Sequence, residues 1–406
     1  MNSIFYREYR NRSLVFENLL FQNHVVETLK REIEGGNLPQ SMLFFGEPYS
    51  GKLTAALELA RVVNCEFTGE WGCSCKSCTQ SLSLQHPYTL LTGSRYSMLE
   101  INQSADFLIN ERSRSSQFVF TRNVRKLIKR FNEDLWDKED NKYKKAVSSL
   151  NNIEEILYLI EPTQNLPAEK KLQSTVKKIL TECGKLANEL PKGNIPISQI
   201  RKISNWVRRS SSGNKKVVIL ERAELMQDSS RNALLKVLEE PPRDTYFILI
   251  SEKRSTVLPT ILSRVRTYSF KHRDNKEQEL ILNKLFKTSS DKNSIKEYFL
   301  SYSDYEGDAF LKIVQNYTEF CFNKDGAFSD ALDSKIDVSY FNEFLEVFTN
   351  ELKKIYYNNE GIISLNQLEA INSSIRDKVI KLLHYNQNPM LLLETLYYEV
   401  KRIIYA

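Results

Sequence analysis

The chain contains 406 residues, of which 41% are hydrophobic and 27% are charged, and this length predicts two or three domains. Its 57 lysine and arginine residues outnumber its 51 acidic residues, and the formal net charge of +6 is compatible with a nucleic-acid neighbour without indicating one alone. No apolar run approaches the roughly 18 residues of a membrane span, and residues 1–10 match neither a signal nor a transit peptide. We therefore expect a cytoplasmic protein without membrane contact.

The first motif in chain order is a damaged phosphate-binding loop. Residues 42–45 predict a buried strand and residues 53–62 predict an amphipathic helix. The segment GEPYSGKLT, residues 46–54, joins them. A working loop reads G-x-x-x-x-G-K-[ST], where backbone N–H groups cradle phosphates, the lysine pairs with the β/γ-phosphates and the hydroxyl binds Mg²⁺.

This loop retains only part of that chemistry. Gly46, Gly51 and Lys52 are present, but Leu53 stands at the hydroxyl position and cannot bind a metal. Thr54 lies one residue later, which rotates it by about 100° around the helix. Binding of ATP or ADP is therefore doubtful, and passive retention of a nucleotide by Lys52 stays open.

Four of the six cysteines lie close together in the sequence, with the spacing C-x7-C-x-C-x2-C. Four thiolates in so short a segment predict a closed tetrahedral zinc site with a structural role. A disulfide is disfavoured because the expected compartment is reducing. His86 is a further candidate ligand. The predicted zinc ligands are Cys65, Cys73, Cys75 and Cys78, whereas Cys183 and Cys321 are expected to be buried thiols.

Residues from about 95 to 193 show helical spacing of apolar residues but no motif, and we expect a helical insertion there. Its first helix is predicted to be basic, with Arg112, Arg114, Arg122, Arg125, Lys126, Lys129 and Arg130. A basic helix can follow a phosphate backbone. A solvated charged face is the alternative, which the acidic residues within 133–140 favour.

A helix, a strand and a loop follow in close succession. Residues 231–240 carry apolar side chains at helical spacing, and residues 228–230 offer N-cap groups. The prolines at 241–242 end this helix, because neither has an N–H to continue it. Residues 245–251 are nearly all apolar, as expected of a strand buried on both faces of a parallel sheet. The segment LPTILSR, residues 258–264, then presents an arginine.

Two of these segments resemble a known family. NALLKVLEEPP (residues 232–242) followed by LPTILSR resembles the clamp-loader branch of the AAA+ ATPases, in the bacterial group that contains the gamma/tau and delta-prime subunits. Members of this group carry a C-x8-C-x2-C-x2-C pattern directly after the phosphate-loop helix. This chain has a similar pattern with a shorter spacing between its second and third cysteines.

The resemblance implies an α/β AAA+ P-loop domain with a helical insertion, then a small helical lid domain and an all-α collar domain used in oligomerisation. The final helix resembles the collar helix of the family, and an internal helical core is the alternative. The expected boundaries are 1–270 for the P-loop domain, with the zinc module at 65–78 and the insertion at about 95–193, 271–325 for the lid and 326–406 for the collar.

The resemblance also indicates which parts of a hydrolytic site are missing. Active members have Asp-Glu after their second core strand, where this chain has Glu221 and Arg222. The family places a sensor arginine three residues after a glycine, and here Phe310 follows Gly307 at that distance. Together with Leu53, these changes remove metal binding, water activation and a positioned charge, so we expect no intrinsic ATPase activity.

Ser263 and Arg264 match the Ser-Arg-Cys motif of the family, with Val265 in place of the cysteine. In clamp loaders this arginine is a finger that enters the ATP site of the adjacent subunit, where such a residue raises the rate by ~10³–10⁵-fold. An arginine that caps the preceding helix is the alternative for Arg264.

A degenerate site beside an intact finger resembles the delta-prime branch of the family. The resemblance then implies a non-hydrolysing ring member of the DNA polymerase III holoenzyme. Its partners would be gamma/tau and delta subunits, the sliding clamp and, through the complex, primed DNA. An active gamma/tau-like ATPase and a DNA-binding protein on the same scaffold are the alternative functions.

Overall fold

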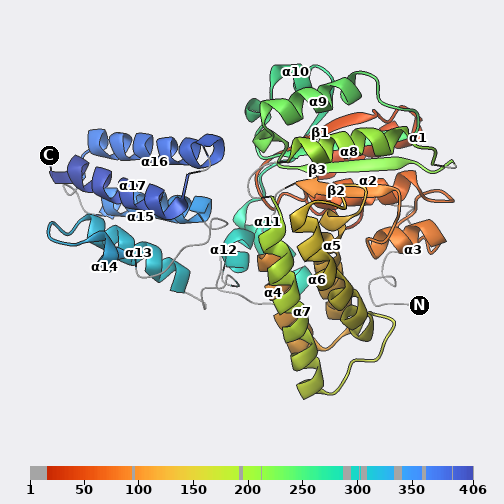
Figure 1. The fold of residues 1–406 in the computed structure, drawn as a ribbon, viewed down its shortest axis with the longest axis horizontal. Helices are drawn as coiled ribbons and strands as arrows, with labels where there is room; N and C mark the ends of the chain where they lie inside the picture. The colour runs from red at the N-terminus through yellow and green to blue at the C-terminus, as the bar shows by residue number, and fades with distance from the viewer. Residues whose placement is uncertain are drawn as a thin grey trace. The chain divides into compact units, whose positions relative to one another are not determined.

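Five parallel strands form the centre of the N-terminal part of the chain (Figure 1). Their order in the sheet is β2-β3-β4-β1-β5 within the described residues. The strands β3 and β4 are almost wholly apolar because helices cover both faces of the sheet. The strands are β1 (Ser41–Phe45), β2 (Thr89–Gly93), β3 (Lys216–Glu221), β4 (Thr245–Ser251) and β5 (Arg266–Ser269).

The structure is a computed structural model, and the chain forms two compact units, Met1–Leu300 and Ser301–Ala406. We describe each unit by itself. The three-domain division expected from the sequence stays a prediction. The described residues are 16–93, 97–191, 195–211, 213–286, 294–300, 302, 309–332, 341–358, 363–385 and 387–405.

Side chains that alternate along β1 enter two different cores. Met42 and Phe44 pack with α1 (Asn23–Glu34) and α2 (Lys52–Val63) on one face of the sheet. Leu43 points to the other face, where it joins a core that includes α8 (Ile197–Arg208) and α9 (Asp228–Glu239). This alternation follows from the two-residue period of a strand, and it places the loop after β1 between the two cores.

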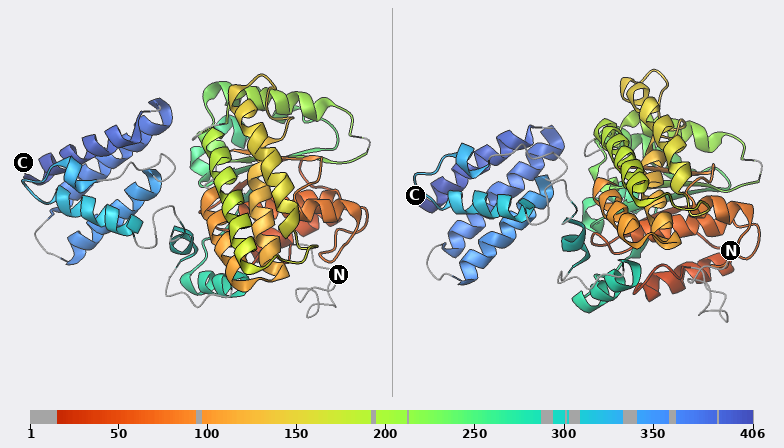
Figure 2. Two further views of the ribbon diagram at one scale, coloured as in Figure 1. Left: turned by 60° about the horizontal axis from the view of Figure 1, so that its bottom comes forward. Right: turned by 90° about the horizontal axis from the view of Figure 1, so that it is seen from below.

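Four long helices between β2 and β3 make up the insertion, and they lie side by side (Figure 2). The prediction that the basic helix comes first is wrong, because an apolar helix, α4, precedes it. Arg112 lies between α4 and α5, and the other basic residues lie on α5 and on the 3-10 turn that ends it. The elements are α4 (Ser97–Glu111), α5 (Arg114–Ile128), η2 (Lys129–Phe131), α6 (Asn141–Leu157), η3 (Tyr158–Ile160) and α7 (Glu169–Glu189).

The helix predicted ahead of the double proline is α9, and it ends at Glu239 as the prolines require. The expected N-cap at 228–230 is wrong, because the helix begins at Asp228 and the N-cap position Gln227 makes no side-chain cap bond. Ser230 instead donates its hydroxyl to the carbonyl of Ile195 at 2.8 Å, which ties α9 to the segment before α8. Short elements near α9 in the chain are η4 (Ala223–Leu225), η5 (Arg254–Thr256) and α10 (Pro259–Leu262), and a further short helix, α3 (Lys76–Leu82), follows α2.

The rest of the described chain is helical. Two helices, α11 (Asn275–Phe286) and α12 (Ile295–Leu300), complete the first unit. The second unit has an aromatic core in which Tyr317 meets Phe344 edge-on, with ring centroids 5.0 Å apart. Its helices are α13 (Ala309–Cys321), α14 (Phe328–Ala331), α15 (Phe341–Asn358), α16 (Leu365–Tyr385) and α17 (Pro389–Tyr405).

The predicted fold class is confirmed: the chain combines an α/β domain of the AAA+ kind, built on a parallel sheet, with helical segments. Gly307 lies outside the described residues, and Phe310 is buried in the second unit, where its ring meets that of Phe344. No helix in the described ranges is long and apolar enough to span a bilayer.

Candidate functional site

The phosphate loop lies between β1 and α2, as the sequence predicts. Gly46 and Gly51 have φ angles of 149° and 98°, which L side chains rarely adopt. A Cβ at Gly46 would lie 2.4 Å from the carbonyl oxygen of Phe270, so close approach of the backbone also requires glycine there. Both glycines of the motif thus occupy positions whose backbone conformation requires glycine.

The lysine of this loop is engaged with the loop itself. Lys52 is 7% exposed, and its ammonium donates hydrogen bonds to the carbonyl oxygens of Gly46 and Glu47 at 2.5 Å each and lies 3.2 Å from Ser50 Oγ. In a working loop these donors pair with the β/γ-phosphates. Leu53 is 6% exposed and packs in the core beside β1, so its position offers no oxygen to a metal.

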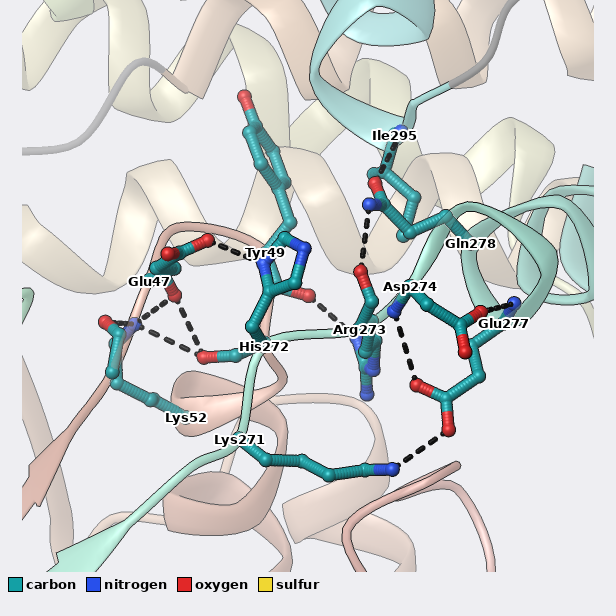
Figure 3. A network of polar contacts seen from close by, with 12 residues as sticks. Glu47, Tyr49, Lys52, Lys271, His272, Arg273, Asp274, Glu277, Gln278 and Ile295 are labelled. Carbon is teal, nitrogen blue, oxygen red and sulfur yellow. Dashed lines mark hydrogen bonds and ion pairs between the residues drawn. The ribbon is translucent and has the colours of Figure 1, made fainter.

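A second cation of the chain, Arg273, lies beside the loop (Figure 3). Arg273 donates to the carbonyl oxygen of Tyr49 at 2.5 Å and to that of Leu20 at 2.8 Å. A Cβ at Gly51 would lie 3.0 Å from Arg273 Nη2, so the guanidinium sits close to the first turn of α2. Burial lowers the pKa of Arg273 to about 10. This is the end of the helix where anions bind in related loops.

An aromatic and an acidic side chain of the loop make further contacts with residues far along the chain. Tyr49 has a φ of 58°, and its ring stacks on that of Phe299 in α12, with centroids 5.4 Å apart and planes 11° from parallel. His272 Nδ1 lies 2.5 Å from Glu47 Oε2 at the rim of the loop (Figure 3). The sequence did not indicate the roles of Arg273 or Phe299, because both follow the motif by more than 200 residues.

The carboxylate at the end of β3 is neutralised from within the chain. Glu221 is 4% exposed and forms an ion pair with Arg130, which is 1% exposed and comes from η2 of the insertion. Arg130 also donates to the carbonyl oxygens of Lys126 at 2.6 Å and Gly93 at 3.3 Å. A guanidinium thus pairs with the acid at the position where an active member would hold an aspartate that supports Mg²⁺.

The neighbouring residue is also paired. Arg222, at the predicted position of the water-activating acid, has a φ of 53° and donates to Glu252 Oε1 at 2.6 Å. It brings a positive charge where a general base would be required. Both sequence departures after β3 are therefore accommodated by ion pairs, and neither position presents a free carboxylate in the described structure.

The basic residues from 122 to 130 turn inward, so neither predicted interpretation holds for them, whereas Arg112 and Arg114 are exposed. Arg122 donates to the carbonyl oxygen of Leu82, the last residue of α3, and Lys126 pairs with Glu100 at 3.0 Å. Arg125 forms an ion pair with Glu161. Lys129 donates to the carbonyl oxygen of His86 at 3.0 Å, and burial lowers its pKa to about 8. The basic side chains from 122 to 130 are therefore engaged within the protein and are not arranged to follow a phosphate backbone.

The four predicted ligand cysteines come together. Their Sγ atoms all lie within 4.8 Å of one another, and they form a potential metal-binding group among the described residues. Zn–S bonds of about 2.3 Å in a tetrahedron place sulfur atoms about 3.8 Å apart, so the cluster is of the size that zinc requires. The short C-x-C spacing does not prevent this arrangement, because Cys75 lies at the N-cap of α3 and Cys78 in its first turn.

Hydrogen-bond donors lie beside two of the thiols, Cys75 and Cys78, although burial raises the pKa of Cys78 and of Cys73 overall. Arg61 is 2% exposed, donates to Cys78 Sγ at 3.0 Å, and pairs with Glu58 at 2.7 Å. Burial opposes ionisation of Cys75, but hydrogen bonds from the backbone of Glu66 and Cys78 outweigh it and lower the pKa of Cys75 to about 7. A buried cation and backbone donors are what a negatively charged four-thiolate shell needs. The residues therefore fit a structural zinc ion.

The other sulfur and imidazole candidates lie elsewhere. His86 is 3.1 Å from Ser77 Oγ through its Nε2 atom, and it lies outside the cysteine cluster. Burial, with a contribution from the charge of Lys129, lowers the pKa of His86 to about 4, so it is neutral near pH 7. Cys183 and Cys321 are buried in other cores.

Arg264 lies at the surface directly after α10. Its Nη1 donates to the carbonyl oxygen of Thr260 at 2.8 Å and to Ser263 Oγ at 3.1 Å, and its Nη2 pairs with Glu239 Oε1 at 2.6 Å. The side chain is 32% exposed. The bond to Thr260 is that of a helix cap, and the partial exposure leaves a guanidinium that a second molecule can reach, so both predicted roles stay open.

The cysteine cluster predicts one zinc ion per chain. Replacing Cys73 by Ser should abolish stoichiometric zinc, because a closed structural site rarely tolerates three thiolates. Metal analysis of the purified protein under reducing conditions measures this directly. Cys183→Ala is the matched control and should keep its zinc. A folded wild-type protein with zinc far below one ion per chain would contradict the assignment.

The buried ion pair predicts a large effect on stability. Arg130→Met should lower the free energy of unfolding by about 3–5 kcal/mol, because Glu221 would be left buried without a counter-charge. Adding Glu221→Leu should recover most of the loss, since both charges are then removed. Urea denaturation measures each variant.

The control for this pair is Arg112→Met, which removes an arginine whose nearest acid, Glu169, is 3.8 Å away and largely exposed. It should change stability by less than about 1 kcal/mol. An Arg130→Met protein as stable as this control would show that the pair does not hold the insertion in place.

A family profile of known proteins matches the part of the chain that contains this site. The profile of the family described as DNA polymerase III, delta subunit, matches residues 21–137 and 124–274, which together span more than half of the chain. The matched range contains the phosphate loop, the cysteine cluster, the insertion and Arg264.

Curated relatives match over shorter segments. The DNA polymerase III subunit delta' of Pseudomonas aeruginosa is 48% identical over 71 residues, 17% of this chain and 22% of that protein. The subunits of the same name from Yersinia pestis and Escherichia coli are 40% identical over 80 residues and 36% identical over 84 residues. These two matches each cover 20% of this chain, and they cover 24% and 25% of those proteins. The matched segments thus span a quarter or less of each relative.

A solved structure of a DNA polymerase III gamma subunit-related protein from Thermotoga maritima is 22% identical and covers 52% of this chain and 81% of its own, with a TM-score of 0.28. That score is too low to support an argument about the fold. The family assignment rests on the profile match alone, and on that ground the chain belongs to the DNA polymerase III, delta subunit family.

Proposed function

We propose that this chain is a delta-prime-like subunit of a DNA polymerase III clamp loader that does not hydrolyse ATP itself. The observation that carries the proposal is the state of its own nucleotide site. Lys52 and Arg273 donate to loop carbonyls, and Glu221 pairs with Arg130. Relatives named as delta' subunits supply the assembly in which such a member would act.

Absence of hydrolysis follows from what phosphoryl transfer needs. The reaction depends on a bound metal ion, a positioned water and charges that stabilise the transition state. Leu53 offers no metal ligand, Glu221 is already neutralised, and Arg222 brings a cation to the position of the base. Each of these changes acts on a different part of the reaction, so reverting one of them would not restore it.

The active contribution of the chain is then Arg264, with Ser263 beside it. A guanidinium on a loop can enter the nucleotide site of an adjacent ATPase subunit and stabilise charge on the transferred phosphoryl group. In this proposal the partners are gamma/tau and delta subunits, and the complex places the sliding clamp on primed DNA in the cytoplasm. The lid at 271–325 and the collar at 326–406 are part of the same proposal, with the collar joining the subunits of the ring.

The two alternative functions have less support. An active gamma/tau-like ATPase would need metal and water activation that residues 53, 221 and 222 do not provide. A DNA-binding protein on this scaffold would need a basic surface on the insertion, and Arg122, Arg125, Lys126 and Arg130 pair inside the protein instead. Zinc has a structural role in this proposal, because four thiolates leave no open coordination position.

The isolated chain should show no ATP hydrolysis above background. A steady-state phosphate-release assay on the purified protein measures this, and Lys52→Ala serves as its matched control. Turnover comparable to that of a working loader subunit, lost in the Lys52→Ala variant, would disprove the proposed lack of activity.

Arg264→Ala should leave the chain folded and assembled but reduce ATP turnover by the complex. The affected site should lose about 2.7–4 kcal/mol of transition-state stabilisation, as on removal of one charge-stabilising donor. Arg264→Lys should rescue poorly, since an ammonium lacks the planar fork that meets phosphate oxygens. The measurements are melting temperature, co-purification with gamma/tau and delta subunits, and clamp-stimulated ATPase activity. A helix cap predicts the reverse, with lower melting temperature and unchanged turnover per complex.

A further inference from the structure

The arginine proposed as a finger is held by an acidic residue of its own chain. Arg264 Nη2 and Glu239 Oε1 are 2.6 Å apart, and Glu239 is the last residue of α9. The helix α9 packs against α10, whose last turn precedes Arg264. The pair thus joins the two elements that carry the sequence motifs of this region.

The pairing uses the side of the guanidinium that a phosphate would need. Both terminal nitrogens of Arg264 are engaged, Nη1 with Thr260 and Ser263 and Nη2 with Glu239. A carboxylate and a phosphate present similar oxygen acceptors to the planar fork of an arginine. Nη2 has a second hydrogen, but a phosphate that accepts it would bring its negative charge beside the carboxylate of Glu239, so the two anions oppose each other at this guanidinium.

The resting arrangement leaves one donor unused. The Nε–H of Arg264 is buried and has no acceptor among the described residues. A buried donor without an acceptor is unfavourable, so this conformation is not the best that the guanidinium can reach. Both side chains are also partly open to solvent, 32% for Arg264 and 50% for Glu239, so the pair is of the weak, exchangeable kind.

We propose that Glu239 is a positioning residue that competes with the neighbouring subunit's ATP for Arg264. Before ATP binds to the adjacent subunit, the carboxylate holds the guanidinium against α10. The terminal phosphate of the bound ATP then displaces the carboxylate. Glu239 acts only through Arg264 and touches no reacting atom. This inference rests on the proposed finger function of Arg264.

The competition determines the fraction of complexes in which Arg264 is free of Glu239 and can contact ATP of the adjacent subunit. When a binding-competent state is only partly populated, the apparent affinity falls by that fraction. Removing the competitor should therefore strengthen apparent ATP binding in the complex without changing the step in which Arg264 acts. The maximal rate should stay the same, because saturating ATP already displaces the carboxylate.

The test uses complexes reconstituted from the full chain and its ATPase partner subunits, with ATP as the varied ligand. Glu239→Gln should lower the KM for ATP by about twofold to fivefold, the range expected for an exchangeable pair, with kcat unchanged. Glu240→Gln is the matched control: it removes the same charge at the next position, where the side chain is exposed and no ion pair forms within the described ranges. It should leave the KM unaltered.

A double variant separates this inference from the finger function. In an Arg264→Ala complex, adding Glu239→Gln should have no further effect on KM, because the two residues act as a unit. If Arg264→Ala alone leaves turnover unchanged, the finger function fails and the inference fails with it. If Arg264→Ala lowers turnover but Glu239→Gln leaves the KM unchanged or lowers kcat, the finger stands and the competition is disproved. A purely structural Glu239 would lower the melting temperature and leave the KM as it was.

Discussion

The buried ion pair between Arg130 and Glu221 is the interaction on which the arrangement of the first unit depends. A carboxylate at the end of a central strand, 4% exposed, is very unfavourable without a counter-charge. In a working P-loop protein, that part of the site supports Mg²⁺ and a nucleotide. Here a guanidinium from the insertion supplies the positive charge that the buried carboxylate requires.

Groups of the chain itself also pair with one another at the phosphate loop. The loop keeps its glycines and its lysine, and its donors are occupied by groups of the chain itself. Bonds that a phosphate would make are replaced by bonds to backbone carbonyls, and the loop reaches across to α12 through stacked rings. These contacts connect the loop with α12 and with the segment that carries Arg273. The contrast with Arg264 is clear, since that guanidinium is partly exposed and held by an exchangeable pair.

The insertion and the cysteine module support each other. Arg122 and Arg125 of α5 donate to carbonyl groups at the end of α3, the helix that begins inside the cysteine cluster. Positive groups are favourable at this end of a helix. On the other side of the module, Arg61 offsets the charge of the thiolates. A zinc ion would therefore fix α3, and α3 in turn provides the surface against which the basic helix packs.

The sequence by itself determined much of this protein. The loop motif, the cysteine cluster, the helix ended by two prolines and the apolar strand are local patterns, and their elements appear where the patterns predict them. It also predicts that Leu53 and Arg222 stand where hydrolytic groups would be required, because those positions are defined by adjacent residues.

Only the tertiary structure decided which residues pair with Glu221, with the phosphate loop and with the basic side chains of α5. Arg130 lies 91 residues before Glu221, and Arg273 more than 200 residues after the loop that it contacts. The sequence predicted that the basic residues of α5 lie at the surface, because charged side chains are usually solvated. Those that pair with an acid or a carbonyl group have that partner on another element. Sequence spacing specifies contacts within one helix or strand, whereas contacts between distant elements depend on how those elements pack.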